Sequence, residues 1–486
     1  MPPSSIAILG GGLTGLSSAF HLSRRFPTAQ IIVLNKQTRF GGWVYSDRVQ
    51  LNNSDQGSSV LLESGPRTLR PNSRAVLELI HLLGLGSSLV TVPKTSPAAK
   101  NRYLRIPGLP GIQPIPTSLS ALLSSPVGRI LLPAVAREPF RARNRIPHNT
   151  DESVDSFLTR RFGEKFASIF GSALVHGIYA ADSRKLSVRT AFPTLWDAEE
   201  RGRGSVVAGF LRSTKPKIET ECELGDIPDI MKGVSVYSFK NGTGTLTEAL
   251  VRELRKTPNV KMYGGVSVRG LRANSISKRF EVSISSNETL HPSHVVSALP
   301  LPILSSILSP LASLPHLTSN PYSSVTVINL VFPANPSSPL HPAGFGYLVP
   351  RPADGYSRHS SGILGCVFDS AATASQDTSD HALKLTVMLG GPYPISSKHV
   401  DIPAVLKNLS SHLGVQLPEP LVARVHQQKE CIPMLGVGHL DRMIELKAAL
   451  SRKPWDGKLE IIGAGVGGVS VGDCVLAGKD VGKNWT

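Results

Sequence analysis

The chain has 486 residues, of which 41% are hydrophobic and 18% charged, so it is long enough for about three folded domains and is not a disordered protein. Lys and Arg (52) exceed Asp and Glu (35) by 17 charges, which favours an acidic partner: a nucleic acid, an anionic membrane surface or an acidic small molecule. Four widely spaced cysteines without a CxxC pair argue against a zinc site and a disulfide framework, and no metal is expected.

No segment of the sequence predicts a membrane-spanning helix. The uncharged stretch Val295–Pro315 is the nearest candidate, but its prolines break any helix long enough to span. A strand that begins by Ile6 leaves no room for a signal peptide or presequence. We therefore expect reduced thiols, an intracellular compartment and, at most, attachment to a membrane surface.

The N-terminus predicts a βαβ unit. Ile6–Leu9 and Ile31–Leu34 are short apolar strands, and a glycine-rich turn opens the helix between them. The turn fits GxGxxG, and its residues are Gly10, Gly11, Gly12, Leu13, Thr14 and Gly15. Such a turn lets a pyrophosphate approach the backbone and the N-terminus of the helix, so it predicts a dinucleotide.

The end of the second strand departs from the usual dinucleotide-binding pattern. Asn35 stands where Glu or Asp usually binds both ribose hydroxyls, and an amide oxygen is a weaker acceptor. Arg39-Phe40-Gly41-Gly42-Trp43 follows as a loop with a cation and two permissive glycines. We expect Asn35, Arg39, Gly41, Gly42 and Trp43 to adjoin the cofactor.

Further elements follow from apolar spacing. Helices are predicted over Ser73–Leu83, over Ser153–Val175, and over Thr245–Leu254 with a capping box of Thr245 and Glu248. Residues 212–232 indicate an exposed, flexible connection, and Val260–Val296 alternates like antiparallel strands. Residues 289–350 contain no Asp, Glu, Lys or Arg and 11 prolines, which predicts strands and turns in a core or cavity wall.

A second glycine-rich turn, Gly463–Gly468, follows the apolar strand Ile461-Ile462 near the C-terminus. Two such turns at opposite ends of one chain suit a cofactor that reaches from one turn to the other. FAD is long enough, with its phosphates at the first turn and its flavin at the second. The cysteines are expected to be core thiols, so the FAD is expected to be non-covalent.

The chain resembles the protoporphyrinogen oxidase family, within the FAD-dependent amine-oxidase-like superfamily, almost from end to end. Besides the first turn and the Arg39 loop, the matching motifs are Glu63-Ser64-Gly65-Pro66-Arg67, Asn101-Arg102-Tyr103-Leu104, Gly177-Ile178-Tyr179-Ala180, Phe192-Pro193-Thr194-Leu195, Ser238-Phe239-Lys240-Asn241-Gly242, Gly344–Pro350, Gly438-His439 and Gly468–Val471. One motif departs: the usual Pro-Gln-Tyr is Pro433-Met434-Leu435 here.

The resemblance implies an α/β fold in which a Rossmann-like FAD-binding domain of amine-oxidase type is joined to a mostly β substrate domain and a helical membrane-binding insertion. The expected division is 1–93, 212–296 and 431–486 for the FAD-binding domain, 94–211 for the insertion with substrate contacts, and 297–430 for the substrate domain. Segment 94–147 carries nine Lys and Arg against one acid, interleaved with leucines and prolines, which favours an anionic membrane surface.

The resemblance also implies the activity: oxidation of protoporphyrinogen IX to protoporphyrin IX with oxygen, releasing hydrogen peroxide, in haem synthesis. Arg102 matches an arginine that pairs with a propionate, Phe345 and Leu348 match residues around the ring system, and Gly177 matches a backbone position beside the substrate. The remaining cofactor positions that it implies are Gly65, Pro66, Arg67, Val266, Val469, Ser470 and Val471. No catalytic residue is assigned, and His439 is expected to be a core histidine rather than a base.

Alternatives remain at this stage. The first alternative is an FAD-dependent oxidase of amines or polyenes, although Met434-Leu435 does not offer the aromatic cage that amine oxidases generally need. The second alternative is a non-catalytic relative that binds FAD and porphyrin. By resemblance the protein is peripheral to the mitochondrial inner membrane. Ferrochelatase and a second copy of the chain are further candidate partners, whereas no binding motif accompanies the positive charge to indicate nucleic acid.

Overall fold

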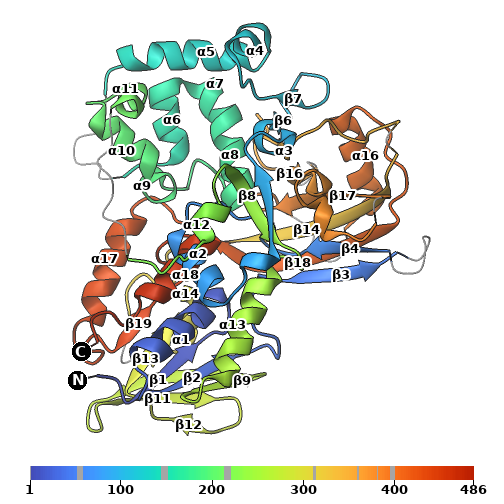
Figure 1. Ribbon diagram of the computed structural model, residues 1–486. Helices are drawn as coiled ribbons and strands as arrows, with labels where there is room; N and C mark the ends of the chain where they lie inside the picture. The colour runs from blue at the N-terminus through green and yellow to red at the C-terminus, as the bar shows by residue number, and fades with distance from the viewer. Residues whose placement is uncertain are drawn as a thin grey trace.

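The computed structural model describes residues 2–51, 58–143, 151–212, 221–309, 313–335, 337–357, 361–379, 381–394 and 400–485. Figure 1 shows three regions: a parallel sheet near the two termini, a large sheet beside it, and a group of helices at the far end from the termini. The expected α/β fold is thus confirmed in its general form, while the proposed division into residue ranges remains a prediction.

The parallel sheet is built from both ends of the chain. Its order is β19 (Leu459–Ile461), β13 (His294–Ser297), β1 (Ser5–Leu9), β2 (Gln30–Asn35) and β9 (Val260–Gly264), and every neighbouring pair is parallel. Side chains of β1 alternate between two cores, with Ile6 and Ile8 in one and Ala7 and Leu9 in the other. Both faces are therefore buried.

Helices cover one face of this sheet. They are α1 (Leu13–Arg25), α2 (Arg74–Leu82), α12 (Ile227–Ile230), α13 (Gly244–Lys256) and α18 (Val471–Asp480). The predicted helix at Ser73–Leu83 is confirmed, with Ser73 preceding its first residue. The capping box at Thr245 is wrong: α13 begins at Gly244, its N-cap is Thr243, and the Thr245 hydroxyl is buried without a hydrogen bond.

The other face is covered by the antiparallel sheet of β10 (Val268–Asn274), β11 (Arg279–Ile284) and β12 (Thr289–Leu290), together with α14 (Leu301–Ile307) and α17 (His439–Leu450). The expectation of antiparallel strands over 260–296 is right for these three strands and wrong for β9 and β13, which are parallel. β13 is fully buried, whereas β9 is a mostly exposed edge strand that pairs with β2, so alternation did not distinguish these parallel strands from antiparallel ones. The charge-free stretch was expected to form strands and turns, but its described part also contains the helix α14. Pro302 does not prevent this helix because it lies in the first turn, where proline is tolerated.

The large sheet has the order β18 (Val422–Pro433), β14 (Tyr322–Pro333), β17 (Ala382–Gly390), β16 (Ile363–Val367), β15 (Gly346–Leu348), β6 (Tyr103–Leu104) and β7 (Gln113–Pro114). Two strand pairs, β3 (Ser46–Gln50) with β4 (Ser59–Glu63) and β5 (Leu89–Pro93) with β8 (Val234–Phe239), complete the strands. Around them lie α3 (Pro97–Lys100), α15 (Asp369–Thr373), α16 (Ile402–Leu413) and the 3₁₀ turns η1 (Gly86–Ser88) and η5 (Ala374–Gln376).

The helical group comprises α4 (Leu119–Ser124), α5 (Gly128–Arg137), η2 (Glu138–Phe140), α6 (Val154–Phe162), α7 (Glu164–Phe166), η3 (Ala167–Gly171), α8 (Ser172–Tyr179), α9 (Val188–Ala191), α10 (Pro193–Arg201) and α11 (Val206–Leu211). The helical region expected over Ser153–Val175 is confirmed, and Gly163, whose φ of +98° ends α6, divides it. Within 212–232, residues 213–220 lie outside the described ranges. Residues 221–232 are mostly exposed, as expected, but Ile227 and Met231 anchor this part of the connection in the core.

Candidate cofactor and substrate site

The first glycine-rich turn presents an open helix end. Gly10 has a φ of +103° and donates its N–H to the Leu34 carbonyl at 2.9 Å, which fixes the turn at the carboxyl ends of β1 and β2. A side chain at Gly15 would overlap the Gly10 carbonyl. Gly12 caps α1 without a side-chain hydrogen bond, and no acidic residue lies in the first turn. Leu13 and Thr14 thus begin a helix that can bind an anion.

The Arg39 loop closes over this turn. Gly41 donates its N–H to the Gly11 carbonyl at 2.8 Å. Asn35 accepts from the Gly11 N–H at 3.1 Å and donates to the Gln37 and Arg39 carbonyls, both at 2.8 Å. Arg39 in turn donates to the Phe40 carbonyl at 3.0 Å. Asn35 therefore connects the glycine-rich turn to the Arg39 loop. The sequence predicted only a contact between Asn35 and a ribose, and not this structural role.

The C-terminal turn adjoins the first one. Ser470 caps α18 in a reciprocal capping box with Asp473, and α18 packs on α1 through a hydrogen bond of 2.9 Å from Ser17 Oγ to the Val475 carbonyl. A Cβ at Gly463 would lie 3.8 Å from Thr14 Oγ1. The two turns thus form one cradle, with the predicted Val469 and Val471 on either side of the cap.

The remaining predicted cofactor residues gather around these turns. Gly65 lies so close to the Trp43 carbonyl that no side chain could replace its hydrogen, and Pro66 accepts a hydrogen bond from Thr243 Oγ1 at 2.7 Å. The Val266 N–H donates to the Asn35 carbonyl at 2.9 Å. Arg67 is buried, with Nε 3.2 Å from Asp369 Oδ1.

These residues suit FAD. The N-terminus of α1 has no side-chain cap, and the glycines of its turn leave the backbone open to a pyrophosphate. There is also open space at the second turn, where a Cβ at Gly467 would meet nothing within 4 Å. The structure does not test which individual residues contact the cofactor, so the named contacts stay predictions.

The predicted substrate residues also lie together, although they come from three parts of the chain. β15 pairs with β6, which sets the Arg102 guanidinium 5.7 Å from the centre of the Phe345 ring. A Cβ at Gly177 in α8 would lie 2.6 Å from Leu348 Cδ2. Arg102 donates to the Ala99 carbonyl at 2.7 Å, and burial, with Arg70 nearby, lowers its pKa from the usual value. The result is one cation beside an apolar wall.

His439 is a core histidine, as expected. It is fully buried, its Nδ1 lies 2.9 Å from Asn320 Nδ2, and its Nε2 lies 3.0 Å from the Val466 carbonyl. The amide must donate to Nδ1, so Nε2 carries the proton and donates to the carbonyl. Burial lowers the pKa of His439, so it is a neutral support of the C-terminal turn.

Sequence reasoning missed a polar cluster behind Arg67. Asp369, Asn329 and Lys384 are buried, and Lys384 Nζ lies 2.8 Å from Asp377 Oδ1. Asn329 falls in the charge-free stretch and the others stand in ordinary segments, so no motif marks them. The available signal is a polar residue among apolar neighbours in a strand, as at Asn329 in β14 and Lys384 in β17.

The helical group exposes large apolar side chains at one end. The most exposed are Phe140, Leu211, Leu119 and Leu123, at 90%, 84%, 80% and 69% of their full exposure. They lie on α4, α11 and η2, and segment 94–147, to which α4 and η2 belong, also carries Arg129, Arg137, Arg141 and Arg143. Residues 144–147 of that segment lie outside the described ranges. Apolar side chains exposed to this extent mark a binding surface.

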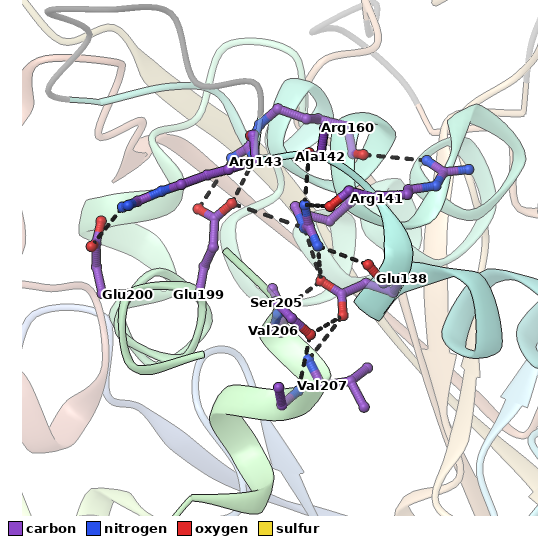
Figure 2. A network of polar contacts seen from close by, with 12 residues as sticks. Glu138, Arg141, Ala142, Arg143, Arg160, Glu199, Glu200, Ser205, Val206 and Val207 are labelled. Atoms are coloured by element: carbon purple, nitrogen blue, oxygen red, sulfur yellow. Dashed lines mark hydrogen bonds and ion pairs between the residues drawn. The ribbon is translucent and has the colours of Figure 1, made fainter. Parts of the chain in front are cut away.

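A buried ion pair fixes this end of the molecule (Figure 2). Arg161 Nη2 and Glu138 Oε1 are 2.6 Å apart, and both side chains are fully buried. Glu138 also accepts from Ser205 Oγ at 2.6 Å and from the Val206 N–H at 2.8 Å. Since Ser205 caps α11, Glu138 joins η2, α6 and α11 and sets the relative position of Phe140 and Leu211.

No helix in the described ranges is long and apolar enough to cross a membrane. An open groove of about 580 Å³ lies along β5 and η5, and none of its lining residues belongs to the predicted cofactor or substrate set. This groove does not bear on the site described above.

Comparisons with known proteins agree with this geometry. The family model for flavin containing amine oxidoreductase matches residues 13–481. Protoporphyrinogen oxidase of Schizosaccharomyces pombe is 33% identical over 505 residues, covering 99% of this chain and 98% of that protein; the human enzyme is 32% identical over 495 residues, covering 98% and 97%. A crystal structure from Exiguobacterium sp. 255-15, provisionally described as a protoporphyrinogen oxidase, superposes with a TM-score of 0.76 at 21% identity, covering 98% and 97% of the two chains.

Proposed function

The chain belongs to the protoporphyrinogen oxidase family of flavin containing amine oxidoreductases, and from this premise we propose that it oxidises protoporphyrinogen IX to protoporphyrin IX as an FAD-dependent enzyme of haem synthesis. The observation that carries the proposal is the meeting of Arg102, Phe345, Gly177 and Leu348 at one wall. A macrocycle that is apolar except for its propionates needs an apolar wall with one cation.

The reaction removes six electrons and six hydrogens, and with oxygen as acceptor it converts three O₂ to three H₂O₂. When bound, FAD supplies the acceptor for hydride equivalents and returns electrons to oxygen. Arg102 orients the substrate by pairing with a propionate, and Phe345 and Leu348 hold the ring and exclude water. His439 takes no proton, because both of its nitrogens are engaged in the core.

The direct test is incubation of the purified, FAD-loaded protein with protoporphyrinogen IX in air, with porphyrin fluorescence and peroxide followed together. Fluorescence should rise with three peroxides per porphyrin. Amines and polyenes, offered as the substrates of the alternative oxidases, should give no peroxide. A protein that binds FAD and porphyrin but produces neither signal is the non-catalytic relative, and the proposal then fails.

We further propose that the exposed end of the helical group binds an anionic membrane surface, and that the protein is peripheral to the mitochondrial inner membrane. The support is the combination of exposed Phe140, Leu211, Leu119 and Leu123 with the arginines of segment 94–147. Apolar side chains enter the interface while each nearby cation adds about 1 kcal/mol on an anionic surface. Ferrochelatase, which consumes protoporphyrin, and a second copy of the chain remain candidate partners at this location.

Liposome sedimentation separates the two components of this binding. Phe140→Ser with Leu211→Ser should weaken binding to anionic and neutral vesicles alike, since it removes apolar surface. Arg137→Gln should weaken binding to anionic vesicles alone, and added salt should have the same effect. As a control, activity in detergent should be the same for the wild type and for both sets of substitutions. If the wild-type protein stays in solution with anionic vesicles, the proposal is overturned.

A further inference from the structure

The polar cluster behind Arg67 encloses a small chamber. It lies where β4 meets β14 and β17 of the large sheet, closed by α15 and η5. About 10 Å³ is free for the centre of a water-sized sphere, which is room for about one water molecule. The residues that line it include Glu63, Arg67, Asn329, Asp369, Thr373 and Thr386.

The orientation of the Asn329 amide is fixed by its neighbours. Asn329 is 2% exposed, and its Nδ2 donates to the Glu63 carbonyl at 3.1 Å and to Thr386 Oγ1 at 2.9 Å. A flipped amide would place an oxygen against the Glu63 carbonyl, so the nitrogen must lie there. Oδ1 is therefore a buried acceptor, and within the described ranges no protein donor reaches it.

Arg67 provides a buried donor in the same chamber. The residue is 7% exposed, and its Nε lies 3.2 Å from Asp369 Oδ1, while Asp369 Oδ2 accepts from Thr386 Oγ1 at 2.6 Å. Arg67 Nη2 is also buried, and no acceptor in the described part of the chain bonds to it. A donor and an acceptor that are both left unpaired in the interior would each keep the full cost of losing their hydration.

We propose that one ordered water molecule occupies this chamber, accepting a hydrogen bond from Arg67 Nη2 and donating one to Asn329 Oδ1. A buried water typically makes about three hydrogen bonds and bridges groups that cannot reach one another. The chamber offers a donor, an acceptor and space for one such molecule. The water binds across the boundary between the β3–β4 pair and the large sheet.

The water makes Asn329 a positioning residue for Arg67. Asp369 of α15 fixes the guanidinium from one side and the water on Asn329 of β14 fixes it from the other, so Arg67 is held by elements outside its own loop. This part rests on the proposed function and on the cofactor position that the family resemblance implies for Arg67. A positive charge there stabilises the anionic reduced flavin, so the position of Arg67 affects the midpoint potential of the flavin.

A crystal structure of the FAD-loaded wild-type protein tests the water directly. The expected result is a peak within about 2.7–3.2 Å of both Arg67 Nη2 and Asn329 Oδ1. An empty chamber overturns the proposal, and so does a flavin atom in contact with Nη2 in place of water. This measurement needs no substrate, so failure of the porphyrin assay leaves it valid.

Asn329→Leu tests the positioning role, because leucine has a similar volume and removes the acceptor. We expect loss of the water, a lower flavin midpoint potential and FAD binding weakened several-fold. Thr373→Val is the matched control: it lines the same chamber, but its hydroxyl donates only to the Asp369 carbonyl at 2.9 Å. If Asn329→Leu folds and keeps the wild-type potential, Asn329 does not position Arg67. If it does not fold, the wild-type density still decides the water.

Discussion

Gly177 and Leu348 are in direct contact across the substrate wall, although 171 positions separate them: a Cβ at Gly177 would lie 2.6 Å from Leu348 Cδ2 and 3.1 Å from Cδ1. The close approach is possible because Gly177 in α8 has no side chain at the point where β15 passes. Since both residues are partly or fully exposed, the contact lies at the surface of the wall and not in its interior.

Gly177→Ala should therefore push the end of the Leu348 side chain into the substrate slot. Overpacking of this kind costs about 1–3 kcal/mol, and the flexible leucine end keeps it near the lower value. We expect a higher KM, normal FAD content and nearly normal stability. In a Leu348→Ala background there is no long side chain to displace, so adding Gly177→Ala should lower kcat/KM much less than it does in the wild type. Additive losses in this double-mutant cycle would show that the two residues do not share one surface.

The sequence predicts the FAD-binding part better than the rest because glycine turns are local. Gly10–Gly15 and Gly463–Gly468 lie where expected, at the ends of β1 and β19. Asn35 was recognised as unusual, but its three hydrogen bonds to Gly11, Gln37 and Arg39 depend on the fold of a loop. An amide at this position can donate to two carbonyls, which a carboxylate cannot do.

Contacts between segments far apart in the chain cannot be predicted from one sequence unless a family motif marks the residues involved. The resemblance placed Arg102 and Phe345 in one site, and pairing of β6 with β15 is the physical reason that they meet. The Asp369–Arg67 pair has no such motif, and neither has Glu138–Arg161. The charges can be buried there because the two members of each pair neutralise each other and each carboxylate accepts a further hydrogen bond, Asp369 from Thr386 and Glu138 from Ser205. Composition and periodicity do not reveal these partners.

Glu63 gives a pH dependence of stability with a definite sign. Burial raises its pKa to about 7 from the usual 4.5, despite hydrogen bonds from Thr243 and Ser46 and the nearby Arg67. The folded state then binds more protons than the unfolded state between about pH 4.5 and 7, so this group's contribution to stability falls as pH rises through that range, by roughly 3 kcal/mol. Above about pH 7 the buried Glu63 carboxyl is ionised, and stability does not fall further because of this group.

Glu63→Gln should remove this dependence, since the amide oxygen can still accept from the Thr243 N–H, and the nitrogen can donate to Ser46 Oγ. The measurement is urea unfolding at several values between pH 5 and 8 for both proteins. The variant should gain stability relative to wild type as pH rises. A constant difference between the two curves would mean that Glu63 ionises outside this range.

The Glu138–Arg161 pair should be a major source of stability in the helical group. Glu138→Gln leaves the fully buried Arg161 with Glu199, 3.9 Å from its Nε, as the remaining counter-charge. The loss should therefore lie near the lower end of the about 3–5 kcal/mol that breaking a buried pair costs. The control is Arg143→Gln, because the Arg143–Glu200 pair of the same region is about half exposed, and such a pair contributes about 0–1 kcal/mol. Thermal unfolding should separate the two variants clearly, and equal losses would contradict the importance of burial.

Arg102 offers the sharpest test of the substrate wall. Its guanidinium lies over the edge of the wall beside Phe345, and burial has already removed part of its water. In Arg102→Ala the propionate would be left unpaired, which costs about 2–5 kcal/mol if it is fully buried and less at an open rim. Because Arg102 is partly exposed, we expect the lower half of that range, about 2–3.5 kcal/mol, which is equivalent to a rise in KM of roughly 30- to 400-fold.

Arg102→Lys should recover only part of this loss, since an ammonium cannot form the two parallel hydrogen bonds of a guanidinium. A decrease in kcat is also expected, because a displaced ring moves the reacting carbon away from the flavin. Steady-state kinetics of the three proteins, with flavin occupancy measured in each, provide the comparison. If Arg102→Ala keeps the wild-type KM and kcat while its binding to anionic liposomes falls, then Arg102 belongs to the membrane-facing basic surface and not to the substrate wall.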